Sequence, residues 1–193
     1  MNKEELILVT GRKLFSQFGL KKVTTEDIAK SAHVSKATVY RYYGNKSEIF
    51  EKVVRLEAEE LLKAIRQAIK REHKVIDKFK AHLRVRFEKI RELVNLYWVT
   101  HETWGDFWPH LAGIGDWFQE EEEKIVKEVM IFGNETGELE VERVDLASHI
   151  TVTVLKSIEL PWALAKQGLT ASEYIDILMD MIINGIGKNK LRN

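Results

Sequence analysis

The spacing of apolar residues is the feature that most limits what this chain can fold into. In most windows, apolar side chains recur every three or four residues, which is the period of an α-helix. The 193-residue sequence contains only two prolines, Pro109 and Pro161, and lacks strand-like segments separated by frequent turn residues. These observations predict an all-α fold.

The N-terminal quarter carries clear signals for where helices begin and end. A helix is expected over residues 4–18, ended by Gly19 because glycine tolerates positive φ. Thr24 or Thr25 should begin a second helix that ends in a tight turn at residues 32–34. Ser35 should begin a third helix through Tyr43, and Asn45 a fourth over 45–70.

The rest of the chain is expected to be helical but less sharply divided. One helix is predicted over residues 74–100. Residues 104–115 contain Pro109 and three glycines, and they should interrupt the helices. A helix should resume over 116–132, and Gly133 and Asn134 with Gly137 should end it. Residues 150–154 have a strand-like composition. A single strand would have no partner in this chain, so we predict that they belong to a helix over 142–167, before a last helix beginning at Thr170.

Composition excludes several classes of protein. The absence of cysteine excludes disulfides and thiolate chemistry, and no apolar run approaches the roughly 18 residues that span a bilayer. The N-terminus, with Glu4 and Glu5, does not resemble a signal peptide, which indicates a cytoplasmic protein. Residues 1–50 hold nine basic and five acidic residues, a net charge of +4, whereas the remainder carries −4. A basic N-terminal segment suits contact with a polyanion such as DNA.

Residues 24–43 have the pattern of a helix-turn-helix. Two short helices are joined by a tight turn, and the second is rich in small polar, basic and tyrosine residues, as a recognition helix requires. Its first turn can present Ser35, Lys36 and Thr38 to bases or phosphates, and the hydroxyls of Tyr40 and Tyr42 can donate to phosphate oxygens. The alternative is that such an amphipathic helical pair only contributes to a core.

A wider pattern favours the DNA-binding interpretation. Residues 7–50 resemble the N-terminal signature of the TetR family of transcriptional regulators. The matching residues are Leu14, Phe15, Gly19, Thr25, Ile28 and Ala29, followed by the segments 34–43 and 45–50. The sequence departs from the family where His33 replaces a usual glycine and where Thr10 and Gly11 replace a usual pair of alanines.

The resemblance assigns DNA contacts position by position. With Ser35 added from the helix-turn-helix pattern, the predicted DNA-binding residues are Thr25, Ser35, Lys36, Ala37, Thr38, Tyr40, Arg41, Tyr42 and Lys46. Lys46 lies at the start of the fourth helix, where its ammonium group and the exposed helix amides could together hold a phosphate. His33 more simply fills its turn, since histidine tolerates left-handed backbone.

The resemblance also implies two domains and a dimer. Residues 1–46 would form a three-helix DNA-binding bundle, and residues 47–193 a larger helical domain for ligand binding and dimerisation. In the family, the last two helices pair with their copies. The residues expected at that interface are Ile175, Leu178, Met179, Ile182, Ile183 and Ile186. This apolar stripe could equally serve the core of its own chain.

The family's middle helices enclose a small-molecule site, and the corresponding region here is unusually aromatic. The predicted ligand-binding residues are Trp98, His101, Trp104, Phe107, Trp108, Trp117, Phe118 and Trp162. Such side chains can surround an apolar ligand, or they can pack against one another and leave no cavity. We expect an apolar or aromatic inducer and no cofactor. His101, Glu102 and His110 lack the spacing of metal ligands.

These inferences predict a homodimeric repressor that binds palindromic double-stranded DNA and leaves it when the inducer binds. Coupling between the two sites of about 1–3 kcal/mol is typical of such proteins. No nucleophile elbow, phosphate loop or paired catalytic carboxylate is present, so an enzyme is not expected. The alternatives are an enzyme, or a protein that binds lipids or other hydrophobic ligands without binding DNA.

Overall fold

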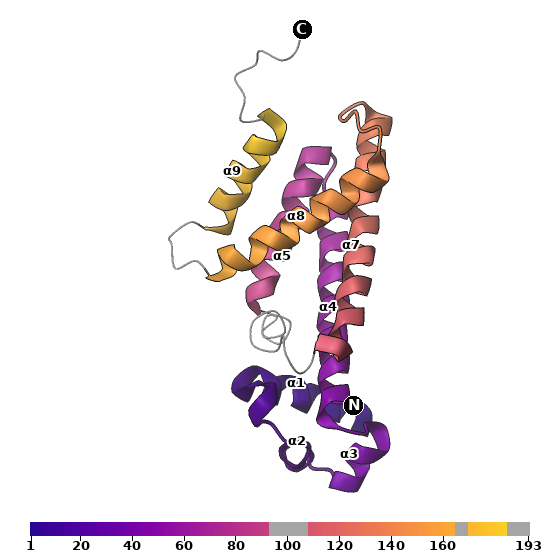
Figure 1. The fold of residues 1–193 in the computed structure, drawn as a ribbon, viewed down its shortest axis with the longest axis vertical. Helices are drawn as coiled ribbons and strands as arrows, with labels where there is room; N and C mark the ends of the chain where they lie inside the picture. The colour runs from indigo at the N-terminus through magenta and orange to yellow at the C-terminus, as the bar shows by residue number, and fades with distance from the viewer. Residues whose placement is uncertain (93–107, 165–169, 185–193) are drawn as a thin grey trace. The chain divides into compact units, whose positions relative to one another are not determined.

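The computed structural model describes residues 1–92, 108–164 and 170–184, and this part of the chain is all-α, as predicted (Figure 1). The helices are α1 (Lys3–Lys22), α2 (Thr25–Ser31), α3 (Lys36–Tyr42), α4 (Lys46–Lys70), α5 (Val75–Glu92), α7 (Trp108–Thr136), α8 (Val144–Leu164) and α9 (Ala171–Asn184). The chain divides into two compact units, residues 1–62 with 90–122, and residues 63–89 with 123–193. We call them the N-terminal unit and the C-terminal unit. None of the described helices is sufficiently long and apolar to cross a membrane.

Local signals set the boundaries of the first helices, with one difference from the prediction. Gly19, expected to end the helix, has a φ of 75° and bends α1, which continues to Lys22. Thr24 caps α2 by accepting a hydrogen bond from the backbone of Asp27, whose carboxylate accepts one from the backbone of Thr24 in return. His33 has a φ of 52°, so the turn keeps its left-handed residue where glycine is usual in the TetR pattern.

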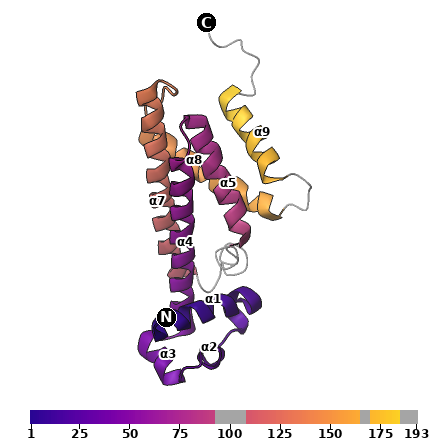
Figure 2. The same cartoon turned by 180° about the vertical axis from the view of Figure 1, so that it is seen from behind.

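The core of the N-terminal unit joins α1, α2, α3 and the first half of α4 (Figures 1 and 2). Its largest side chains include Phe15 and Phe50, whose rings meet edge to face with centroids 5.1 Å apart. Ile28 from α2 and Val39 from α3 are fully buried in the same cluster. The helix-turn-helix is therefore held on one hydrophobic core, which fixes the direction in which α3 points.

Gly11 allows α1 to approach α4 closely. A β-carbon at this position would lie 2.9 Å from Cγ2 of the fully buried Ile49 and 3.4 Å from the Phe15 ring. We expect Gly11→Ala to lower the free energy of unfolding by about 1–2 kcal/mol, because overpacking outweighs the roughly 1 kcal/mol gained in helix propensity. Urea unfolding of the two proteins measures the difference. A more stable variant would show that Ile49 can move aside.

The start of α7 contradicts the sequence prediction. We expected residues 104–115 to interrupt the helices, but α7 begins at Trp108 and continues through residue 115 to Thr136. Pro109 lies in the first turn, where its missing N–H would have no intrahelical partner. Gly113 and Gly115 are isolated in the helix, and each costs only about 1 kcal/mol relative to alanine.

The helix passes Gly133 and Asn134, two of the three residues expected to end it, and stops at Thr136, directly before the third, Gly137, whose φ is 72°. A β-carbon on Gly133 would lie 2.6 Å from Cδ1 of Leu139. This glycine therefore allows the chain after α7 to fold back against the helix, rather than ending it.

Two clusters form the core of the C-terminal unit. Leu83 and Phe87 of α5 pack with Leu155 of α8 and with α9, and Val126 and Met130 of α7 pack with Val152 of α8. The strand-like segment 150–154 is helical, as predicted, because its residues alternate between these cores and solvent at helical spacing. Residues 93–100 of the helix predicted over 74–100 lie outside the described residues.

Candidate nucleic-acid interface

The outer face of α3 is polar, basic and exposed. The exposed residues on this helix are Lys36, Ala37, Tyr40, Arg41 and Tyr42, while Val39 is fully buried on the opposite face. Tyr40 and Tyr42 are 48% and 40% exposed, so their rings and hydroxyls are accessible to a partner. Five of the sequence-predicted DNA-binding residues of α3 are therefore accessible.

Ser35 and Thr38 fix the start of α3. The Ser35 hydroxyl accepts a hydrogen bond from the Thr38 backbone N–H at 3.1 Å, and the two hydroxyls lie 2.8 Å apart. Both side chains are consequently ordered before any ligand arrives. Prior ordering lowers the entropic cost of using them as hydrogen-bonding groups on a partner.

The charged groups of α3 are held only loosely. The Lys36 ammonium lies 3.4 Å from a carboxylate oxygen of Glu26, with both side chains more than half exposed, so the pair contributes at most about 1 kcal/mol. The Arg41 guanidinium lies 5.1 Å from the centroid of the Tyr42 ring. Both cations can turn toward a phosphate at little cost.

The end of α3 is anchored by Tyr43, which is only 7% exposed. Its hydroxyl donates a hydrogen bond to Glu4 of α1 at 3.5 Å. Burial, followed by the nearby negative charge of Glu4, raises the pKa of Tyr43 to about 12. Tyr43 therefore stays neutral at physiological pH and ties α3 to α1, in contrast to its two exposed neighbours.

The first turn of α2 carries Thr25, half-buried and directly after the cap at Thr24. The Thr24 hydroxyl and backbone N–H donate to Asp27 at 2.6 and 2.9 Å, and both bonds hold the pKa of that carboxyl below its usual value. The negative charge of Asp27 is thus kept at the positive end of α2, which fixes the helix start that bears Thr25.

Lys46 has a structural role that sequence reasoning missed. Its ammonium group donates to the backbone carbonyls of Leu20 and Val23, each at 2.9 Å, and to that of Lys21 at 3.3 Å. It thereby holds the end of α1 against the start of α4. We predicted a phosphate contact for Lys46, and its three donors point to carbonyl groups in this structure.

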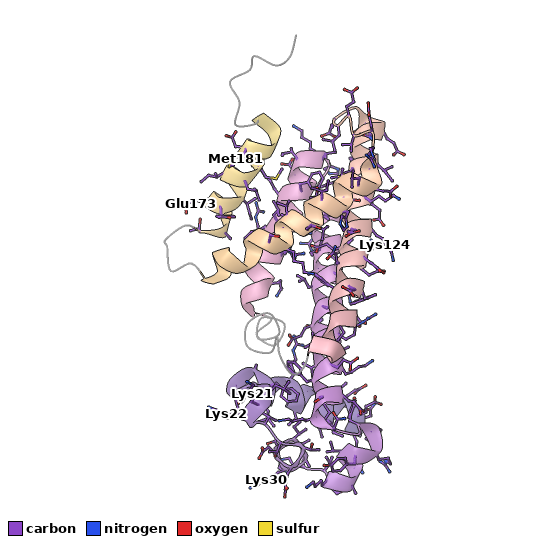
Figure 3. All side chains as sticks on the ribbon, viewed as in Figure 1. Lys21, Lys22, Lys30, Lys124, Glu173 and Met181 are labelled. Carbon is purple, nitrogen blue, oxygen red and sulfur yellow. The ribbon has the colours of Figure 1, made fainter. Side chains whose placement is uncertain are left out.

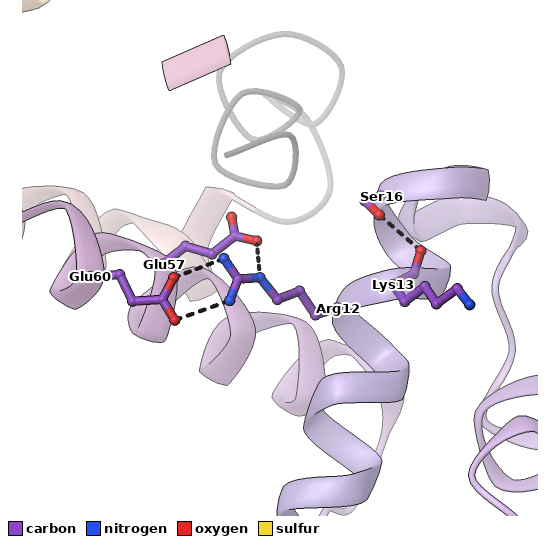
Figure 4. Close-up of polar contacts among 5 residues, drawn as sticks. All are labelled: Arg12, Lys13, Ser16, Glu57 and Glu60. Atoms are coloured by element: carbon purple, nitrogen blue, oxygen red, sulfur yellow. Dashed lines mark hydrogen bonds and ion pairs between the residues drawn. The ribbon is translucent and has the colours of Figure 1, made fainter. Parts of the chain in front are cut away.

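A second anchor between α1 and α4 also escaped sequence reasoning. The Arg12 guanidinium pairs with Glu57 at 3.0 Å and, through two nitrogens, with both carboxylate oxygens of Glu60 at 3.0 and 2.9 Å (Figure 4). The Glu57 side chain is 2% exposed. Hydrogen bonding to Glu60 is the main cause of a raised pKa of Arg12.

The first half of α7 is part of the N-terminal unit and packs against its core. Ile114 is buried in its core and Trp117 packs against it, with the Arg55 guanidinium stacked 3.1 Å from the centre of the indole ring. Trp117, predicted as a ligand-binding residue, thus lies on the core that supports the helix-turn-helix. Phe118 is half-buried. The other predicted ligand-binding side chains, Trp98, His101, Trp104, Phe107, Trp108 and Trp162, lie outside the described side chains.

The apolar stripe on α9 divides between core and surface. Ile175 and Met179 are buried in the core of the C-terminal unit and Leu178 is half-buried against it. The side chains of Ile182, Ile183 and Ile186 lie outside the described ones. Other apolar residues of α8 and α9 are exposed, and we refer to them together as the α8–α9 face. They are Leu146, Ile150 and Val154 of α8, and Ile177 and Met181 of α9, of which Met181 is labelled in Figure 3.

Comparison with known proteins places residues 7–53 in the family model of bacterial regulatory proteins of the TetR family. A 53-residue segment is 40% identical to the uncharacterised HTH-type transcriptional regulator YhgD of Bacillus subtilis. A 71-residue segment is 37% identical to the nucleoid occlusion factor SlmA of Pasteurella multocida. These segments cover 28% and 36% of this chain and only 28% and 35% of the two relatives.

Solved structures match nearly the whole chain. The fatty acid degradation regulator FadR of Bacillus halodurans superimposes with a TM-score of 0.74 at 18% identity, covering 96% of this chain and 97% of that one. FadR of Bacillus subtilis, solved in complex with stearoyl-CoA, gives a TM-score of 0.75 at 18% identity, covering 95% and 99%. At such identities the match concerns the fold.

Proposed function

This chain belongs to the TetR family of bacterial regulatory proteins, and we propose that it binds operator DNA as a homodimer and represses transcription until a small apolar effector releases it. The family is one of regulators and not of enzymes. The single observation that carries the proposal is the surface of α3, where two basic residues and two tyrosines are exposed on a helix whose Val39 is fully buried in a core.

The geometry of α3 suits the major groove. A recognition helix contacts bases with its N-terminal residues, here Lys36 and Ala37, while later residues contact the phosphates. The exposed tyrosines and Arg41 can serve as those phosphate contacts, since hydroxyl and guanidinium donors are typical partners of the DNA backbone. One such helix contacts few base pairs, so a two-fold dimer on a palindromic site is needed for useful specificity.

The α8–α9 face supports dimerisation. Ile150 and Val154 of α8 are 51% and 48% exposed, and Ile177 and Met181 of α9 are 54% and 45% exposed. Exposed apolar side chains that gather in one patch are typical of a protein interface. We propose that this face, and not the buried stripe residues Ile175 and Met179, meets the second copy.

The proposed switch runs through α7. Its first part packs on the N-terminal unit through Ile114 and Trp117, and its later part contributes Val126 and Met130 to the core of the C-terminal unit. A ligand that binds in the C-terminal unit and displaces α7 would alter the support of the helix-turn-helix. The two recognition helices of the dimer would then no longer match successive major grooves of the DNA. The FadR structure with stearoyl-CoA supports an acyl-type effector.

Selection of binding sites from random double-stranded DNA by the purified protein tests the proposal directly. We expect enrichment of a palindrome with half-sites about one helical turn apart, and binding that weakens steeply as salt rises. A protein that enriches no sequence at low salt, although it is folded and dimeric, would refute the DNA-binding function.

Tyr42→Ala should weaken binding to the selected operator about tenfold, because each subunit loses one phosphate contact worth roughly 0.5–1.5 kcal/mol. The dimer and the thermal stability should be unchanged, since Tyr42 is exposed. Mobility-shift titration measures the affinity, with Lys63→Ala as a control, because Lys63 is an exposed residue of α4 in the C-terminal unit. Unchanged operator affinity in Tyr42→Ala would mean that α3 does not seat on DNA as we place it.

A further inference from the structure

The C-terminal unit contains a groove of ligand size between the end of α4, the start of α5 and the second half of α7. Its volume is about 340 Å³, near the lower end for small-molecule sites. Its lining residues are Arg66, Ile69, Lys70, Lys78, Ile125, Glu128, Val129 and Phe132.

The floor of the groove is apolar. Ile125 and Val129 of α7 are 2% and 5% exposed, and the half-buried Ile69 of α4 and Phe132 of α7 complete the lining. Aliphatic and aromatic walls without polar groups favour a hydrocarbon chain over a polar ligand, since they offer contact area and no hydrogen-bond partner.

The rim is basic. Three cationic residues, Arg66, Lys70 and Lys78, face a single carboxylate, so the lining carries a net charge of +2. The Arg66 guanidinium lies 3.2 Å from the Glu128 carboxylate, with both side chains exposed, and such a pair is easily exchanged for another anion. Among the residues that the structure describes, none forms a hydrogen bond or ion pair with the exposed Lys70 ammonium.

The ammonium group of Lys78 is held in place at the boundary between the basic rim and the apolar floor of the groove. Its ammonium donates to the carbonyls of Glu72 at 2.6 Å and Ile69 at 3.2 Å, at the end of α4. It also lies 5.0 Å from the centre of the Phe132 ring. The negative end of α4 is thus covered by a positive group, so an incoming anion meets cations rather than bare carbonyl oxygens.

We propose that this groove binds the head group and first carbons of a long-chain fatty acid, with the carboxylate between Arg66 and Lys70 and the chain on the floor. The assignment rests on the proposed function and names the class of its effector: an anionic amphiphile, not a neutral aromatic compound. Charge complementarity selects the acid over its neutral analogues. The groove borders the end of α4, the helix that Lys46 ties to α1 at its start and Arg12 ties to α1 near its middle.

Calorimetric titration of the full-length protein with sodium palmitate, below its critical micelle concentration, tests the site. Hexadecanol has the same chain without the charge, and we expect it to bind at least about tenfold more weakly, a difference of 1.4 kcal/mol. The double variant Arg66→Gln/Lys70→Gln should lose palmitate affinity by a similar factor. The control Lys63→Gln removes an exposed cation of the same helix outside the groove and should bind like the parent.

Equal binding of acid and alcohol, or full affinity in the double variant, would overturn the assignment. A free acid and a membrane phospholipid share this chemistry, so sedimentation with phosphatidylglycerol vesicles separates them. Binding to vesicles without binding of monomeric palmitate would also overturn it.

DNA-site selection is performed without any lipid. If the protein selects an operator but does not bind palmitate, the groove is not a fatty-acid site, and the proposed DNA-binding function is unaffected.

Discussion

Replacing Ile150 and Val154 together by glutamate is expected to yield a monomer whose operator affinity is lower by at least about 100-fold, because joining two binding modules typically raises affinity by 10²–10⁴. Both side chains are about half exposed on α8, so the charges do not enter the core of the C-terminal unit. They would instead bring four negative charges, two from each copy, into a two-fold interface in which the same surface patch of both copies meets.

Light scattering and mobility shift measure the two effects separately. The parent should scatter as twice its 22.5 kDa chain, and the double variant as one chain with an unchanged helical circular dichroism spectrum. Ile131→Glu is the matched control, because Ile131 is an apolar residue of α7, 40% exposed, outside the α8–α9 face. A double variant that stays dimeric would move the interface elsewhere. Monomers with full operator affinity would show that the helix-turn-helix works alone.

The N-terminal half of the fold could be predicted because its signals are local. Thr24 and Ser35 cap helices with partners three residues away, and Gly19 and His33 occupy left-handed positions that few residues tolerate. Each of these features is set within one turn of helix, so the sequence around it carries the information. The exposed face of α3 follows from Val39 alone, which fixes the buried side of a seven-residue helix.

What could not be predicted depends on contacts distant in sequence. Arg12 reaches Glu57 across 45 positions, and Lys46 reaches back to Leu20 across 26. Neither spacing carries a periodic signal, and each residue alone has the character of a surface or DNA-binding cation. Trp117 is similar, since aromatic composition indicates burial but not whether the ring packs on the N-terminal core or lines a ligand site.

The α8–α9 face was readable in principle. Leu146, Ile150 and Val154 recur every four residues and mark one side of a helix. Because the composition around them is strand-like, the helical spacing was not used. We placed the predicted interface on the stronger apolar stripe of α9 instead. Ile175 and Met179 of that stripe turn inward, which a sequence periodicity cannot distinguish from an intermolecular face.

Arg12→Met should lower the free energy of unfolding by about 2–3 kcal/mol, because it removes the guanidinium that neutralises a carboxylate buried in the N-terminal unit. The Glu57 side chain is 2% exposed, so water cannot take the place of the lost guanidinium there. Arg12 itself is 38% exposed, so part of its charge is already screened, and the expected loss stays below the 3–5 kcal/mol seen when fully buried pairs are broken. Methionine keeps an unbranched apolar side chain at this position while removing the charge.

Urea unfolding followed by circular dichroism measures this loss, and two further variants identify its cause. Arg12→Met/Glu57→Gln should recover about half of it, since a neutral amide tolerates burial better than a charge. Lys80→Met is the matched control: it removes the cation paired with Asp176, which is 59% exposed, and should cost less than about 1 kcal/mol. If Arg12→Met and Lys80→Met cost the same, the bridge between α1 and α4 is an ordinary surface pair, and operator binding should not depend on it. If the larger loss is found, α1 and α4 act as one rigid support, and Arg12→Met should also weaken operator binding in proportion to the disorder it allows at α3.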